Sequence, residues 1–134
     1  CKLDSAHADE LAKIINALGC WPRIDYVGHD ACFYAFLIAQ HCDHDLAFQK
    51  RCLEEMSKAV RYGKAEKQYY AMLIDRVLVN EGRLQRYGSQ LESDDDGRLI
   101  PKRMETPHEV DQRREAMGME PIESYISFCQ ATLI

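Results

Sequence analysis

The densest group of side chains able to move protons or bind a metal lies in one short turn. His41, Asp43 and Asp45 occur there within five residues, between two strongly apolar segments. A carboxylate beside an imidazole can orient it for general acid or base chemistry, and both groups also bind divalent metals. We therefore expect His41 to be the general base or acid, with Asp43 or Asp45 as its orienting carboxylate.

A metal site at the same turn is an alternative to direct acid–base chemistry. His41, Asp43 and Asp45 would then be the ligands, and a metal-bound water would be the nucleophile. Adjacent residues of one turn do not easily all face a single point, so this site needs a further ligand from elsewhere in the chain. Asp45 also has a simpler interpretation as the N-cap of the next helix, where its carboxylate accepts from free backbone amides.

Side chains suited to holding a small polar molecule follow in three later segments. Gln49 lies one helical turn after the acidic turn and on the core side, so its amide needs a partner. Arg76 can present a planar guanidinium to a carboxylate or phosphate. An irregular segment adds further polar groups, and loops commonly carry binding residues. The substrate-binding residues that we expect are Gln49, Arg76, Gln85 and Gln90, with Tyr87 as a second proton donor or a hydrogen-bonding wall.

Length and charge narrow the classes of protein. A chain of 134 residues is the size of one ordinary domain, so we expect a single domain over residues 1–134. The net charge of −5 gives no attraction for nucleic acid or for an anionic membrane. The longest apolar run, residues 31–39, is about half of the ~20 residues that a membrane-spanning helix needs. A small polar molecule is therefore the expected partner, with no nucleic acid and no membrane.

Apolar residues recur at helical spacing along most of the chain. Glycines follow several of these stretches and mark where the helices end. The expected helices span residues 4–18, 29–41, 46–62, 65–81 and 106–117, and a last one begins near residue 121, with residues 23–28 as a loop. The fold class that we predict is all-α: a compact bundle of five to six helices with one irregular loop or small hairpin near residues 83–104.

Two local patterns add detail to this fold. Thr106, Pro107 and Glu109 have the form of a capping box with proline at the first helical position. Asp75 and Arg76 interrupt an apolar helix, where charged groups persist only with partners, so a structural ion pair between them is the simple interpretation.

The six cysteines show no Cys-x-x-Cys pair, and most of them lie inside apolar helical patterns. A domain of this size does not need disulfides, so we expect buried free thiols and a reducing compartment, the cytoplasm. The chain also has no glycine-rich phosphate loop and no other nucleotide-binding pattern, so we expect no organic cofactor.

Several motifs together resemble a family of small, mostly bacterial proteins of unknown function. The similarity runs from about residue 21 to residue 125. The motifs that carry it are Gly19-Cys20-Trp21-Pro22, Val27-Gly28, Gln40-His41-x-Asp43-x-Asp45-x-x-Phe48-Gln49, Asp75-Arg76-Val77, Glu81-Gly82 with Gln85-x-Tyr87-Gly88-Ser89-Gln90, Asp95-Asp96-Gly97 and Val110-Asp111-x-Arg113-Arg114. The resemblance implies that these polar groups belong to one arrangement, without naming a reaction. Arg113 and Arg114 enter by resemblance alone, and a solvated helix face is their simpler interpretation.

The leading hypothesis is a small helical enzyme that processes a small molecule by His/Asp acid–base chemistry. Hydrolysis, elimination and cyclisation are the reaction classes that fit such a site without an organic cofactor. One alternative is a divalent-metal-dependent hydrolase at His41, Asp43 and Asp45. A second alternative is a non-catalytic binding or immunity-type protein, whose polar cluster is an internal network and whose acidic surface docks a basic partner.

Overall fold

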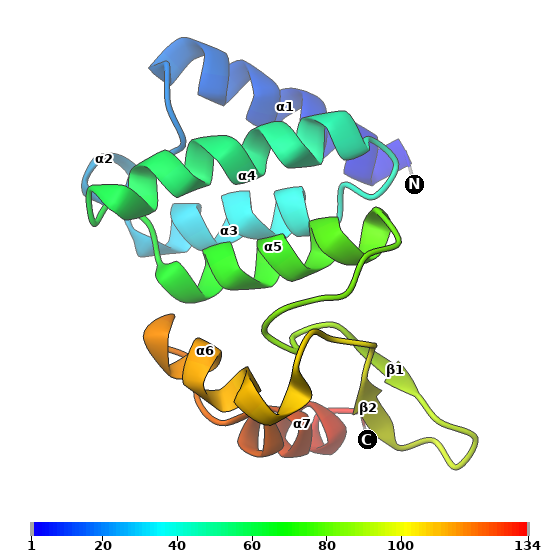
Figure 1. The fold of residues 1–134 in the computed structure, drawn as a ribbon. Helices are drawn as coiled ribbons and strands as arrows, with labels where there is room; N and C mark the ends of the chain where they lie inside the picture. Colours follow the sequence, from blue (N-terminus) through cyan, green and yellow to red (C-terminus); the bar gives the residue numbers. More distant parts are fainter. Residues whose placement is uncertain (1, 134) are drawn as a thin grey trace. The chain divides into compact units, whose positions relative to one another are not determined.

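The computed structural model describes residues 2–133 and is mostly helical with one small two-stranded sheet (Figure 1). Within these residues the chain forms seven α-helices, one 3-10 helix and two short strands. The prediction of a mostly helical fold with a small hairpin is therefore confirmed. The described helices outnumber the five to six that the pattern predicts, because one short helix lies in a segment expected to be a loop.

The chain forms two compact units that divide between Leu73 and Ile74, inside one helix. The first unit holds the His41 turn, and the second holds the Arg76 and Gln85–Gln90 segments. Each unit is described by itself below. The expectation of a single domain over residues 1–134 stays a prediction.

The first unit consists of helices whose ends agree closely with the apolar pattern. They are α1 (Lys2–Leu18), α2 (Ile24–Val27), α3 (His29–Gln40), α4 (Leu46–Arg61) and the first half of α5 (Lys67–Asn80). Gly19 follows α1 with a φ of +72°, a conformation that glycine adopts without a steric penalty. Its amide donates to the carbonyl of Ile15 at 2.8 Å and closes the helix.

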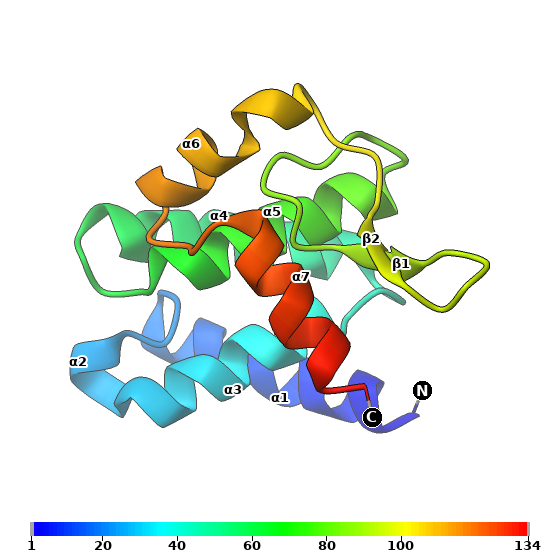
Figure 2. The same ribbon diagram turned by 90° about the horizontal axis from the view of Figure 1, so that it is seen from below.

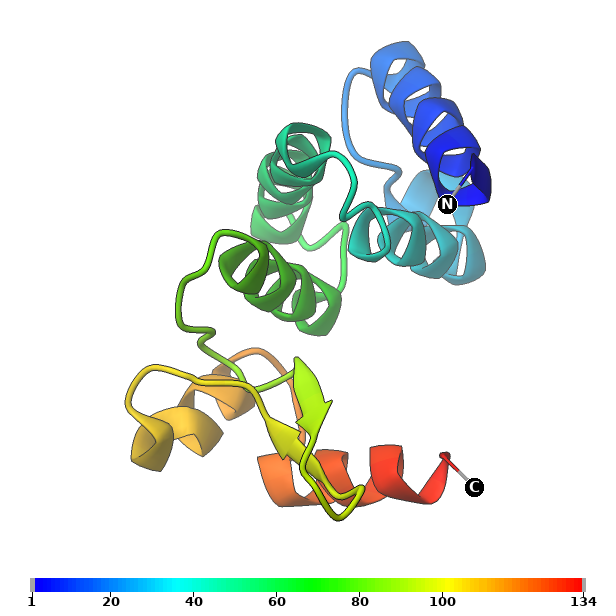
Figure 3. The same ribbon diagram turned by 90° about the vertical axis from the view of Figure 1, so that its right-hand side faces the viewer.

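The core of the first unit is formed by one face of each long helix. On α4 the buried residues Gln49, Cys52, Met56 and Ala59 recur every three or four positions, as an amphipathic helix requires. On α1 the buried positions are Ala8, Leu11 and Ile15. Figure 3 shows α1 lying beside α3, and the two helices are in contact.

Two expectations for the first unit are wrong. Residues 23–28 were expected to be a loop, but α2 occupies residues 24–27. The amide of Ile24 donates to the carbonyl of Lys64 at 3.0 Å, a long-range bond that no local pattern encodes. Residues 29–41 are apolar on every side of a helical wheel, a pattern that predicts a central helix buried all round. In the structure Tyr34 is 63% exposed and Phe33 is 38% exposed, so one face of α3 is open.

The second unit begins within α5 and contains the hairpin and the last helices. Its further elements are β1 (Leu91–Ser93), β2 (Leu99–Pro101), the 3-10 helix η1 (Pro107–Glu109), α6 (Val110–Ala116) and α7 (Ile122–Ala131). The strands pair antiparallel, with Glu92 opposite Ile100, and residues 94–98 connect them in the small hairpin that the sequence predicts near residues 83–104. An isolated bridge between Gln85 and Met104 extends the pairing of the two flanking segments.

The outer edge of β2 is closed by a side chain and by a proline. The amide of Leu99 donates to the side-chain oxygen of Gln130 on α7 at 2.7 Å. Pro101 has no N–H to offer. Figure 2 shows β2 beside α7, in agreement with the contacts between these two elements.

The expected capping box at Thr106 is wrong. Thr106 has a φ of 35° and a ψ of 69°, and its side chain makes no capping hydrogen bond. A left-handed backbone is unusual for a β-branched residue. The Thr106 carbonyl accepts from the amide of Glu109 at 3.0 Å and from the Arg113 guanidinium at 3.3 Å, so contacts made by the backbone hold this turn.

The cysteines of the described residues agree with the prediction of free thiols that are mostly buried. Cys20, Cys32, Cys42, Cys52 and Cys129, all within the described residues, are free thiols. Three of them, Cys32, Cys42 and Cys52, are buried. Among residues 2–133 no helix combines the length and apolar character that crossing a membrane requires.

Candidate functional site

His41 lies at the edge of a hollow of about 360 Å³ in the first unit. Two helices supply its lining: α1 carries Asp4 and His7, and α3 carries Tyr34, Leu37 and Ile38 and ends at His41. Residues three, four and seven positions apart share a helix face, so Tyr34, Leu37 or Ile38, and His41 line up along α3. In the same way Asp4 and His7 are one turn apart on α1.

His7 and Asp4 were not among the site residues expected from the sequence. The apolar spacing of residues 4–18 predicts only a packing face, and Asp4 at the start of this stretch also suits a helix N-cap. The structure starts α1 at Lys2, so Asp4 lies within the first helical turn instead of preceding it. The signal available in the sequence was the three-residue spacing of Asp4 and His7 on a helix that packs against α3.

The side chains of this hollow are suited to proton transfer. Two imidazoles, one carboxylate and one phenol lie around two aliphatic side chains. His41 and His7 are exposed, so both imidazoles can exchange protons with solvent. Imidazole side chains commonly serve as general acids and bases in enzymes.

The turn between α3 and α4 is organised by Gln49, which is fully buried. Its amide nitrogen donates to the carbonyls of Ala39 and Gln40, at 3.0 and 3.4 Å, and to the Asp43 carboxylate at 3.4 Å. The prediction that this amide faces the core is confirmed. Its observed donor contacts are with the turn itself, and substrate binding by Gln49 stays a prediction.

Asp45 is the N-cap of α4, as its simpler interpretation predicts. One carboxylate oxygen accepts from the amide of Phe48 at 3.0 Å. Asp43 and Asp45 are both exposed, and their contacts fix the segment that follows His41. Their roles as orienting carboxylates for His41 stay predictions.

Cys42, the neighbour of His41, is fully buried. Burial, reinforced by the negative charges of Asp45 and Asp43, raises the pKa of its thiol to about 11. Its sulfur lies 3.9 Å from a ring nitrogen of His44. Cys42 is therefore a protonated thiol at neutral pH, which disfavours a nucleophilic role.

In the second unit the Gln85–Gln90 segment is folded around a buried carboxylate. Asp75 is fully buried. It accepts from the amides of Arg86, Tyr87 and Ser89, at 2.8 to 3.0 Å, and from the Ser89 hydroxyl at 2.7 Å. These four bonds from the loop give the buried carboxylate its partners, and an ion pair between Asp75 and Arg76 stays a prediction.

The expected substrate-binding residues of this unit lie in the same network. Gln85 is fully buried, and its amide nitrogen donates to the carbonyls of Gln90 and Lys102. Its oxygen accepts from the amide of Gln90 at 3.0 Å. The Gln90 side chain accepts from Arg76 at 3.0 Å and donates to the Ser89 hydroxyl at 3.2 Å. Arg76, Gln85 and Gln90 are thus brought together by hydrogen bonds.

Tyr87 is 9% exposed, and its ring centre lies 5.9 Å from the Arg86 guanidinium. The backbone of Tyr87 takes part in the hydrogen-bond network around Asp75, since its amide donates to Asp75 and its carbonyl accepts from Arg114. A role for its phenol in proton donation stays a prediction.

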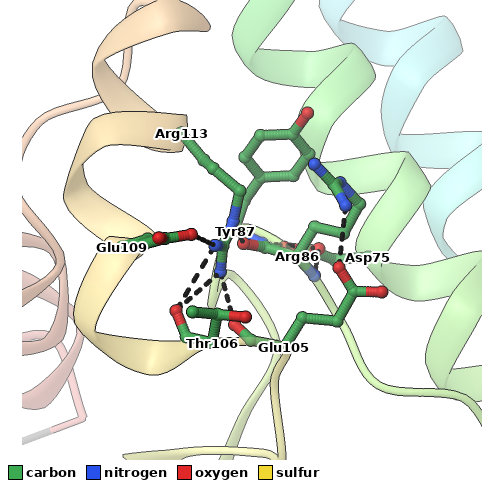
Figure 4. Close-up of polar contacts among 7 residues, drawn as sticks. All are labelled: Asp75, Arg86, Tyr87, Glu105, Thr106, Glu109 and Arg113. Atoms are coloured by element: carbon green, nitrogen blue, oxygen red, sulfur yellow. Dashed lines mark hydrogen bonds and ion pairs between the residues drawn. The ribbon is translucent and has the colours of Figure 1, made fainter.

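Arg113 and Arg114 do not form a solvated helix face, so that simpler interpretation is wrong. Arg113 donates to the carbonyls of Arg86 and Glu105, at 2.7 and 2.5 Å, and Figure 4 shows its guanidinium among Glu105, Thr106 and Glu109. Arg114 is 1% exposed and donates to the carbonyls of Glu120 and Tyr87, at 2.7 and 2.6 Å. Burial lowers the pKa of Arg114.

The two groups of predicted site residues therefore differ in character. The group near His41 borders a solvent-accessible hollow, whereas the group around Asp75 is a hydrogen-bonded network of buried side chains and loop amides. Within residues 2–133 no three histidine, cysteine or acidic side chains are arranged to hold a metal ion. The metal alternative at His41, Asp43 and Asp45 stays untested.

This fold and hollow define a small, mostly helical protein with a surface site lined by histidines. The chain belongs to the family of unknown function DUF6624, whose family model matches residues 1–133. This match confirms the resemblance to a family of unknown function. Comparison with curated proteins and with solved structures gave no match.

Proposed function

We propose that the protein is a small-molecule-processing enzyme that uses acid–base chemistry at the His41 hollow. The observation that carries this proposal is the presence of two imidazoles and a carboxylate around one hollow, with His41 at its edge. The reaction classes are hydrolysis, elimination and cyclisation, with no organic cofactor. The free buried thiols favour a reducing compartment, the cytoplasm, for this activity.

His41 is the proton-transfer group in this proposal. Its neutral imidazole removes a proton from water or from the substrate, and the imidazolium then protonates the leaving group. His7 and Asp4 line the same hollow, and in this proposal the Asp4 carboxylate stabilises the charged imidazolium. Asp43 and Asp45 act through the turn, since their contacts hold the segment that follows His41.

The experiment compares turnover in matched histidine variants. A panel of chromogenic esters, lactones and amides is tested with the native protein, with His41→Asn and with His108→Asn. His108 is an exposed histidine of the second unit and serves as the control. Losing the acid–base group costs roughly a hundredfold or more in rate, so His41→Asn should lose this factor while His108→Asn retains full activity.

Circular dichroism of each variant checks that the helices persist. Full turnover by a folded His41→Asn protein contradicts the proposed mechanism. An equal loss in the His108→Asn control also contradicts it, because the effect would then not belong to the hollow.

A further inference from the structure

We propose that the His41 hollow binds an uncharged or cationic ligand with an apolar body, and that it disfavours carboxylates and phosphates. This inference rests on the proposed function, which identifies the hollow as the site, and it adds the chemical class of the ligand.

The apolar part of the ligand is inferred from the aliphatic side chains of the lining. Leu37 and Ile38 are half-buried neighbours on α3 and contribute aliphatic surface to the hollow. The Tyr34 ring, 63% exposed, adds an aromatic face at the edge. Apolar surface of this kind gains free energy when a hydrocarbon or aromatic group covers it.

The charge of the ligand is inferred from which ionic groups line the hollow. Asp4 carries a negative charge, and the lining residues found within residues 2–133 include neither arginine nor lysine. An anionic ligand therefore meets repulsion from Asp4, while a cation is attracted by Asp4 and by the Tyr34 ring.

The charges and apolar side chains that line the hollow also limit which substrates the proposed reactions can use. Acyl transfer from a neutral ester or amide, or elimination from a neutral or amino compound, suits the lining. Phosphate monoesters and dicarboxylates do not, because no arginine or lysine of residues 2–133 lines the hollow to pair with their charge.

The test uses three probes of similar shape that differ in charge: benzyl alcohol is neutral, benzylamine is cationic and benzoate is anionic. Binding is followed at about pH 8, where benzylamine and benzoate are both charged, through the ring-proton NMR signals of the histidines. We expect benzyl alcohol and benzylamine to shift the signals of His7 and His41 in a saturable way, and those of His29 and His108 to stay unmoved. Benzoate should bind about two- to fivefold more weakly than benzylamine, the range for one exposed charge interaction.

Matched variants identify the cause of the preference. Asp4→Asn should remove the advantage of benzylamine over benzoate, while Asp9→Asn should keep it. Asp9 is an exposed carboxylate of the same helix that does not line the hollow. Leu37→Ala should weaken all three probes together, because it reduces only apolar contact.

Benzoate binding equal to or tighter than benzylamine binding overturns the ligand class. So does a failure of all three probes to move the His7 and His41 signals. Both outcomes are independent of turnover. If His41→Asn keeps full turnover while the probes follow the expected order, the proposed mechanism fails and the ligand class stands. If His41→Asn loses turnover but benzoate binds best, the ligand class alone fails.

Discussion

The carboxylate of Asp75 accepts hydrogen bonds from both the backbone amide and the side-chain hydroxyl of Ser89, at 3.0 and 2.7 Å. Together with the amides of Arg86 and Tyr87, these donors surround a side chain that has no exposed surface. A carboxylate can accept from all of these donors at once, because both of its oxygens are acceptors. One helical residue thereby fixes the conformation of the loop that follows the helix.

The first prediction concerns this carboxylate. Asp75→Asn replaces one acceptor oxygen by an NH₂ group that faces other donors, so we expect the free energy of unfolding to fall by roughly 2–4 kcal/mol. Ser89→Ala removes only the hydroxyl bond and should cost about 1 kcal/mol. Urea titration followed by circular dichroism measures both. Equal losses in the two variants would show that the backbone amides contribute nothing to the role of Asp75.

The second prediction concerns Gly88. A Cβ at this position would lie 2.3 Å from the Cδ1 atom of Ile122, and the φ of Gly88 is +68°. Gly88→Ala therefore combines steric overlap with backbone strain, and we expect a loss of roughly 2–4 kcal/mol in unfolding free energy. Gly97→Ala is the control, because its φ is +80° but no atom lies within 4 Å of the added Cβ. Gly97→Ala should cost only about 1 kcal/mol, the strain of the left-handed backbone.

The third prediction concerns the buried guanidinium of Arg114. It reaches the carbonyls of Glu120 and Tyr87 with two different nitrogens and lies 5.0 Å from the Tyr125 ring centre. A lysine ammonium cannot reproduce this planar fork, so Arg114→Lys should lower the melting temperature and cost about 2–3 kcal/mol. Arg98→Lys, at an exposed position, should change the stability by less than about 0.5 kcal/mol. Equal stability of the two variants would contradict the contribution assigned to the fork.

The fourth prediction concerns alkaline pH and the buried thiols. Burial raises the pKa of Cys42 to about 11 and that of Cys52 to about 12, above the ordinary value of 9.0. Above about pH 9 the unfolded chain loses these protons while the folded chain keeps them. The unfolding free energy should therefore fall as pH rises, by up to about 1.4 kcal/mol per pH unit for each thiol.

Urea titrations between about pH 8 and pH 11, with a reductant present, measure this slope. A Cys52→Ala variant should show a shallower alkaline slope than the native protein, whatever its stability at neutral pH. An unchanged slope would mean that the Cys52 thiol does not contribute to the alkaline loss.

Local sequence pattern was enough to predict the long helices, but it could not predict elements that are stabilised by contacts distant in sequence. Gly19 and Gly63 end their helices where the sequence predicts, because a left-handed residue follows the last apolar position. The helix α2 was missed because its first amide bonds to Lys64, forty residues further along the chain. At Thr106 the capping-box pattern is present, yet contacts from Arg113 to backbone carbonyls accompany a different turn.

Part of the candidate site could also be predicted from local pattern. The residue types and spacing of the turn at residues 41–45 predicted His41 as a site residue. Helix periodicity predicted that the Gln49 amide faces the core, and Gln49 is buried. Sequence spacing could not show that His7 and His41 line one hollow, because they belong to α1 and to the end of α3, which come together only through packing. The burial of Arg114 could not be predicted from local spacing either, since one of its partners is the carbonyl of Tyr87, 27 residues earlier in the chain.

The closed edge of β2 has a consequence for how this protein behaves at high concentration. An unpaired strand edge is a template on which another chain can add a strand, and such additions can continue into fibres. Gln130 occupies the Leu99 amide and Pro101 offers none, so an incoming strand finds no donor at either position. The hairpin can therefore remain short and solvent-facing without recruiting a second molecule along that side.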